Sequence, residues 1–148
     1  MDRAERAAEL FLQGYNCAQA VAVAFADLTG LSPELSAKMA SSFGGGMGRM
    51  REVCGAVSGM LLVTGLLYGY DAPEDAQGKK ELYALVQRLA GQFRQQNGSI
   101  VCRELLNNPP SDPNPSPRTA EYYRRRPCAA MVYTAAQILD GYIAEHPV

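Results

Sequence analysis

A chain of 148 residues is long enough to bury one substantial core, so we expect a single domain over residues 1–148. Hydrophobic residues make up 47% of the chain and charged residues 20%, which excludes wholesale disorder. A formal net charge of -1 argues against proteins that bind nucleic acids or anionic membranes, because both classes need a basic surface.

No segment has the pattern of a targeting signal or of a membrane span. The first residues, Met1–Arg6, carry charges in place of the apolar stretch of a signal peptide. The longest apolar stretch, Val53–Tyr68, is interrupted by small and polar residues and is shorter than the roughly 20 residues that a span needs. We therefore expect a cytoplasmic protein without membrane insertion, in which this stretch is a buried helix.

Two helices are predicted at the start of the chain. Residues 2–13 place apolar side chains at helical spacing with charges between them, which is typical of an amphipathic helix. The next helix covers residues 17–28, where Asn16 and Gln19 have the spacing of a capping box. This second segment is rich in alanine and has no polar face, so we expect it to be buried.

A third helix and a glycine-rich loop follow. Ser32 is the expected N-cap, with Pro33 at the first helical position, and the helix runs to about residue 43. Residues 44–48 read Gly-Gly-Gly-Met-Gly and predict a sharply turning loop. No strand precedes these glycines and no Gly-Lys-Ser/Thr follows them, so a phosphate-binding loop is not indicated.

The fourth predicted helix, over residues 53–68, is hydrophobic nearly all round, which places it in the core. Gly55 and Gly59 lie four residues apart and share one face of this helix. Small residues there let another helix backbone approach closely. The same apolar surface would also suit a homodimer.

The second half of the chain predicts three more helical segments. Asp71 with Glu74 begins a fifth helix, which Asn97-Gly98 closes. Ser99 caps a short helix, and the final helix opens at Pro127. Between them, residues 107–118 hold five prolines and form an irregular loop, here called the proline-rich loop. The predicted fold is all-α: a compact bundle of six or seven helices with one proline-rich loop.

The candidate site residues are the four cysteines, Cys17, Cys54, Cys102 and Cys128. Their separations are long, so no local zinc-ribbon or ferredoxin spacing exists. Each nevertheless falls in the first turn of a predicted helix. The single histidine, His146, lies two residues from the end of the chain, which makes a histidine-based triad or metal site a poor candidate.

A helix start favours the thiolate form of a cysteine, because first-turn N–H groups are unpaired and carry the positive end of the helix dipole. Thiolate is the form that attacks disulfides and ligates metals. Neighbouring arginines would add to this effect if they point the same way: Arg49, Arg51, Arg103, Arg124, Arg125 and Arg126. The alternative is four unrelated cysteines that pack as small hydrophobic residues.

The segment Cys54-Gly55-Ala56-Val57-Ser58-Gly59 matches a Cys-Gly-Ala-x-x-Gly signature, with one cysteine before it and two after it. In this order the chain resembles the putative redox-active family named for its C_GCAxxG_C_C pattern. The resemblance covers nearly the whole chain, including Gly14-Tyr15-Asn16-Cys17-Ala18 and Phe43-Gly44-Gly45-Gly46. It implies a small helical protein whose cysteines are redox-active.

A similar arrangement is attached to some multihaem cytochromes, which suggests iron–sulfur ligation. The first hypothesis is therefore a [2Fe–2S] cluster held by the four cysteines, for electron transfer or redox sensing with a partner protein. Gly55, Ser58 and Gly59 are the candidate cofactor-contacting residues, although Ser58 also suits a small packing position. Four tyrosines are further candidates for lining a pocket: Tyr15, Tyr68, Tyr122 and Tyr123. No Cys-x-x-Cys-His segment exists for covalent haem.

Two alternatives stay open. The same four cysteines would serve as redox-active thiols in a metal-free thiol–disulfide protein, although no Cys-x-x-Cys pair is present. A helical interaction module with a structural zinc site, or with no metal, is the other alternative. The sequence does not decide whether the protein is an enzyme.

Overall fold

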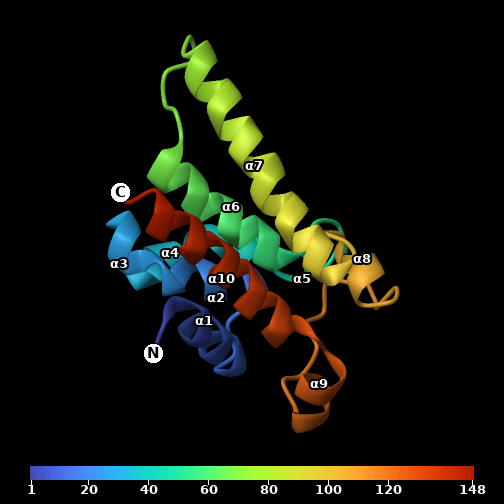
Figure 1. The fold of residues 1–148 in the computed structure, drawn as a ribbon. Coiled ribbons are helices and arrows are strands. Elements are labelled where there is room, and N and C mark those ends of the chain that lie inside the picture. The colour runs from blue at the N-terminus through green and yellow to red at the C-terminus, as the bar shows by residue number, and fades with distance from the viewer.

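Apart from one isolated β-bridge, all regular secondary structure of the chain is helical in the computed structural model, which describes residues 1–148 (Figure 1). The elements in chain order are α1 (Arg3–Leu12), α2 (Cys17–Ala24), α3 (Ala26–Thr29), α4 (Pro33–Ala40), the 3₁₀ turn η1 (Ser41–Phe43), α5 (Gly44–Met47), α6 (Gly55–Tyr68), α7 (Ala76–Asn97), α8 (Cys102–Leu105), α9 (Ala120–Arg125) and α10 (Cys128–Glu145). The predicted all-α class is confirmed. The helix number differs because the short elements α3, α5 and α9 carry no periodic pattern of their own.

The core forms where α10 packs against α1, α2 and α6. Figure 1 shows α10 crossing the bundle beside α6, while the N-terminal part of α7 projects beyond the other helices. Phe11, Phe25 and Phe93 are among the largest fully buried side chains. These aromatic residues come from α1, from the end of α2 and from α7, so the core joins distant parts of the chain.

Helices α2 and α6 approach closely through glycine, as predicted. A Cβ atom on Gly59 would lie 2.6 Å from the carbonyl oxygen of Ala18. A Cβ atom on Gly55 would lie 3.1 Å from the Cβ atom of Cys17. The two glycines therefore set the distance between the helices that begin at Cys17 and just after Cys54.

Local caps are confirmed at several predicted positions. Asn16 and Gln19 form the capping box of α2, and the Ser32 hydroxyl accepts a hydrogen bond from the Leu35 N–H at the start of α4. Gly98 closes α7 in the left-handed conformation, with φ of 89°. These interactions span only a few residues, which is why the sequence reveals them.

Two helix boundaries were predicted wrongly. The helix expected over residues 17–28 breaks at Phe25, whose backbone leaves the helical region and separates α2 from α3. The fifth helix begins after Asp75 and not at Asp71, because the Asp75 carboxylate accepts the N–H of Gly78 at 2.8 Å.

Helix α6 also differs from the prediction in its burial, and helix α8 in its cap. Helix α6 is not buried all round, since Leu66 is 47% exposed on its second half. Ser99 does not cap α8 directly: its hydroxyl accepts the N–H of Val101, the residue that precedes the helix. No helix combines the length and the apolarity that crossing a bilayer requires.

Candidate functional site

All four cysteines line one small cavity of about 50 Å³. Cys17, Cys102 and Cys128 are the first residues of α2, α8 and α10, and Cys54 is the N-cap residue of α6. Their predicted placement at four helix starts is confirmed. None of the four is in a disulfide. Four helices from distant parts of the chain thus direct their N-terminal ends to one point.

A short backbone pairing brings Cys54 and Cys102 to the cavity together. The Cys54 N–H donates to the carbonyl oxygen of Ile100 at 2.7 Å, and the Cys102 N–H donates to that of Glu52 at 2.6 Å. An antiparallel bridge joins Val53 and Val101 between these bonds. The pairing therefore holds the starts of α6 and α8 side by side.

The glycine-rich loop allows this close approach. Gly46 has a φ of 69°, a left-handed conformation in which residues with a Cβ atom are strained. A Cβ atom at Gly46 would also lie 2.7 Å from the Cβ atom of Cys102. Only glycine fits at this position, so the loop wraps directly against the cysteine cavity.

Cys17 and Cys128 are neighbouring thiols of the cavity with unequal acidity. Interaction with the Cys17 thiol, helped by the charges of Arg126 and Arg118, lowers the pKa of Cys128 to about 7. Interaction with the Cys128 sulfur, together with burial, raises the pKa of Cys17 well above its ordinary value. Cys128 is therefore the more acidic thiol of the pair.

Burial dominates at the other two cysteines. It raises the pKa of Cys54 to about 12, although the N–H groups of Ala56 and Val57 act in the opposite direction. Burial also raises the pKa of Cys102, and the Arg51 guanidinium only partly offsets this. The lower pKa expected at every helix start is found at Cys128 alone, where the Cys17 thiol and the arginine charges cause it. At Cys54 and Cys102 the loss of water outweighs the groups that stabilise a thiolate.

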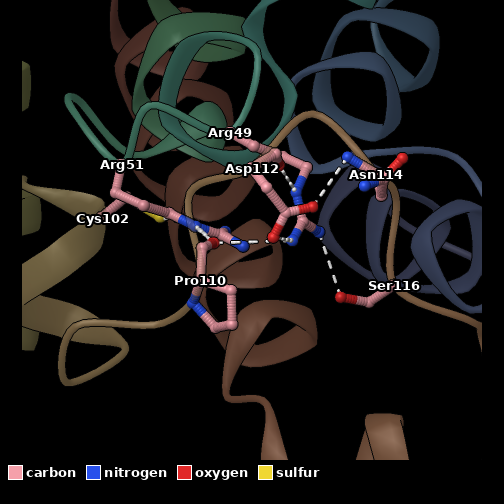
Figure 2. Close-up of polar contacts among 7 residues, drawn as sticks. All are labelled: Arg49, Arg51, Cys102, Pro110, Asp112, Asn114 and Ser116. Atoms are coloured by element: carbon pink, nitrogen blue, oxygen red, sulfur yellow. Dashed lines mark hydrogen bonds and ion pairs between the residues drawn. The ribbon is translucent and has the colours of Figure 1, made fainter.

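Arg51 is the most unusual polar residue in the cavity wall. It is only 4% exposed, and its Nη1 lies 3.7 Å from the Cys102 sulfur. Its Nε donates to the carbonyl oxygen of Pro110 at 2.9 Å, while its Nη2 has no partner (Figure 2). The Arg51 guanidinium is thus held between the Cys102 thiol and the proline-rich loop, and its Nη2 donates no hydrogen bond.

The other arginines expected near the cysteines differ in their contacts. Arg126 lines the cavity, but Arg103 pairs with Glu52 at 2.8 Å. Arg49 turns to the proline-rich loop, where it donates to the carbonyl oxygen of Asp112 at 2.7 Å and to the Ser116 hydroxyl at 3.0 Å (Figure 2). The remaining two arginines, Arg124 and Arg125, lie outside the cavity wall.

Sequence reasoning missed Arg118. This residue lines the cavity, and its guanidinium lies 4.5 Å from the centre of the Phe11 ring. It also donates to the carbonyl oxygens of Phe11 and Tyr15, both at 3.0 Å. Arg118 ends the irregular proline-rich loop, where no periodic signal indicates which way a side chain points.

The candidate cofactor residues are only partly gathered at the cavity. Gly55 and Tyr122 line it, whereas Ser58 and Gly59 do not. Gly59 lies against the α2 backbone, and the Ser58 N–H bonds to the Cys54 carbonyl oxygen in the helix. The other tyrosines, Tyr15, Tyr68 and Tyr123, lie outside the cavity wall.

The donor set of the cavity is four cysteine sulfurs, which suits both iron–sulfur clusters and zinc. As the side chains stand, no group of three or more metal-ligating residues lies close enough to hold one metal ion. A single zinc ion would need every sulfur about 2.3 Å from one point. Zinc binding would therefore require the cysteine side chains to move together.

Comparison with known protein families gives one result. The family described as "Putative redox-active protein (C_GCAxxG_C_C)" matches residues 15–142. All four cysteines fall within the matched segment, as do the glycine-rich loop and the proline-rich loop. No curated protein and no solved structure matches the chain.

Proposed function

Because the chain belongs to the C_GCAxxG_C_C family of putative redox-active proteins, we propose that its four cysteines form one redox centre. We further propose that this centre holds a [2Fe–2S] cluster for electron transfer or redox sensing. The observation that carries the proposal is the convergence of four cysteines, each at a helix start, on one cavity.

The electrostatics of the cavity support this assignment. Four thiolates with a [2Fe–2S] core carry net negative charge, which is costly in a buried site. Helix N–H groups and the guanidinium groups of Arg51, Arg118 and Arg126 would offset that charge. When bound, the cluster would supply one-electron transfer.

A metal-free dithiol is the second candidate, favoured by the unequal acidity of the neighbouring thiols Cys17 and Cys128. The Cys128 thiolate would attack a substrate disulfide, form a mixed disulfide and release one substrate thiolate. Cys17 would then give up its proton and attack the Cys128 sulfur, which releases the second substrate thiol. Two electrons pass to the substrate disulfide, and Cys17 and Cys128 end as a disulfide.

Anaerobic purification with iron, sulfide and zinc analysis tests the two candidates. Visible absorbance with about two iron and two sulfide per chain supports the cluster. A colourless, iron-free protein that reversibly loses two thiols, with a Cys17–Cys128 disulfide in its peptide map, supports the dithiol. Stoichiometric zinc with no redox response would contradict both.

The variant Cys54→Ser separates the candidates further, because Cys54 belongs to the cluster set but not to the dithiol pair. The cluster proposal expects this variant to lose iron and keep its helical circular dichroism. The dithiol proposal expects it to keep a Cys17–Cys128 redox couple. Thr134→Ser, on α10 outside the cavity wall, is the control and should behave like the wild type.

A further inference from the structure

A wider cavity of about 280 Å³ adjoins the cysteine cavity and shares part of its wall, including Arg51, Arg118 and Arg126. Arg49 also lines this outer cavity, and none of its 13 lining residues is acidic. We call it the arginine vestibule. The chain as a whole has a net charge of -1, so this positive charge is a local feature.

Two of the four guanidinium groups are already occupied by the protein. Arg49 is bound to the proline-rich loop, with Asp112 at 3.9 Å as its ion-pair partner. Arg118 donates to two backbone carbonyls and lies over the Phe11 and Tyr122 rings. These two residues shape the vestibule and contribute charge, but they offer few free donors.

The other two guanidinium groups keep unused donors. The Nη2 atom of Arg51 is buried without any partner. Arg126 makes no side-chain hydrogen bond and no ion pair within the structure, and its guanidinium lies 5.1 Å from the centre of the Tyr122 ring. Leaving a buried donor unpaired costs about 1–3 kcal/mol, so folding alone does not favour this arrangement.

We propose that the arginine vestibule binds a small anionic molecule, whose carboxylate or other oxyanion group is held by Arg51 and Arg126. Guanidinium groups bind oxyanions through short, charge-assisted hydrogen bonds, and Arg126 has its planar fork free for two of them. The vestibule has no acidic wall residue to attract a cation.

The shared wall indicates what such a molecule would do. Arg51 touches the Cys102 sulfur and also lines the vestibule, so an anion held there lies next to the cysteines. The ligand is thus an anionic substrate or oxidant of the redox centre. This second step rests on the proposed function, whereas anion binding itself does not.

The deciding experiment is a sulfate titration of the purified protein, followed by the Nε–H signals of its arginines in ¹H–¹⁵N spectra. Sodium sulfate replaces sodium chloride at constant ionic strength. We expect saturable shifts of the Arg51 and Arg126 signals. In Arg126→Gln, the apparent affinity at Arg51 should fall roughly fivefold or more, as expected for the loss of one charge close to the anion.

Arg124→Gln is the matched control, since Arg124 is the neighbouring exposed arginine of α9 and does not line the vestibule. It should bind sulfate like the wild type. Unshifted Arg51 and Arg126 signals in the wild type, or an equal loss in Arg124→Gln and Arg126→Gln, would overturn the vestibule proposal. Iron and thiol analysis of the same samples tests the redox centre separately, so the two failures are distinguishable.

The link between the anion site and the cysteines has its own test in the reduced, metal-free protein. Iodoacetate and iodoacetamide both alkylate a thiolate with loss of iodide, but only iodoacetate carries a negative charge. We expect the ratio of their rates at Cys128 to fall roughly fivefold in Arg126→Gln and to stay unchanged in Arg124→Gln. Equal ratios in all three proteins would disprove delivery of anions to the cysteines.

Discussion

Cys128 should be the most reactive thiol of the reduced, metal-free protein at neutral pH. Its pKa is lowered from 9.0 to about 7, so about half of it is thiolate at pH 7, against about 1% of an ordinary thiol. The lower basicity also makes the thiolate a weaker nucleophile, by roughly eightfold for a shift of about two pH units. The net gain at pH 7 is therefore roughly sixfold over an unperturbed cysteine.

The assay is the rate of iodoacetamide labelling at each cysteine, measured by peptide mass spectrometry across a series of pH values. The labelling rate of Cys128 should have its midpoint near pH 7, while Cys54, with a pKa of about 12, stays unlabelled. Cys17→Ala removes the thiol that contributes most to the lowered pKa of Cys128. In that variant the midpoint should move upward.

Two results would refute this reasoning. A wild-type midpoint near pH 9 would mean that Cys128 is not stabilised as a thiolate. An unchanged midpoint in Cys17→Ala would mean that the arginine charges, and not the thiol pair, set its acidity. Thr134→Ser, on the same helix as Cys128, is the control and should leave the midpoint unchanged. Ala129→Gly, next to Cys128, is not a suitable control because the new glycine alters the helix.

Three further predictions concern stability and the proline-rich loop. Gly59→Ala places a Cβ atom 2.6 Å from the Ala18 carbonyl oxygen and should destabilise the protein by about 1–3 kcal/mol in urea unfolding. Gly65→Ala in the same helix meets no atom within 4 Å and should stabilise it by up to about 1 kcal/mol; equal effects of the two variants would disprove close α2–α6 packing. The raised pKa of Cys54 means that the folded state keeps a proton that the unfolded state releases, so the free energy of unfolding of the metal-free protein should fall as pH rises from about 9 toward 12. Cys54→Ser should flatten that decline, and an unaltered slope would contradict it. Arg51→Met removes the donor to the Pro110 carbonyl and should speed amide exchange or proteolysis in the proline-rich loop, while unchanged protection there would show that Arg51 does not hold it.

Local signals account for the part of the fold that the sequence predicted. The capping box of Asn16 and Gln19 involves residues three apart, and it correctly placed Cys17 at the start of a helix. Where two caps compete, the same local reasoning fails. Asp71 and Asp75 are both suitable N-caps, and it is the Asp75 carboxylate that accepts a helix N–H, that of Gly78.

The cavity itself depends on contacts that no local pattern contains. Cys54 and Cys102 meet because the backbone of Glu52 pairs with that of Cys102, about fifty residues away. The charge around the sulfurs is equally non-local. Arg51 is close to Cys54 in sequence but contacts Cys102, and Arg118 reaches the cavity from an irregular loop. The sequence therefore identifies the cysteines and includes Arg51 and Arg126 among six candidate arginines, but it does not select these two and gives no sign of Arg118.

These arginines bear on the alternative that the four cysteines are only small packing residues. Cysteines that only fill space need no charged neighbour. Burying a charged side chain costs free energy unless all of its hydrogen-bonding groups are paired. Arg51 is buried beside Cys102 with one donor unpaired, and its backbone has a φ of 62°, a conformation that costs a residue with a side chain roughly 1–2 kcal/mol. Strained backbone and unpaired polar groups of this kind are concentrated at functional sites, where binding or chemistry compensates for their cost in stability. Their location in the wall that holds all four cysteines favours a functional centre over simple packing.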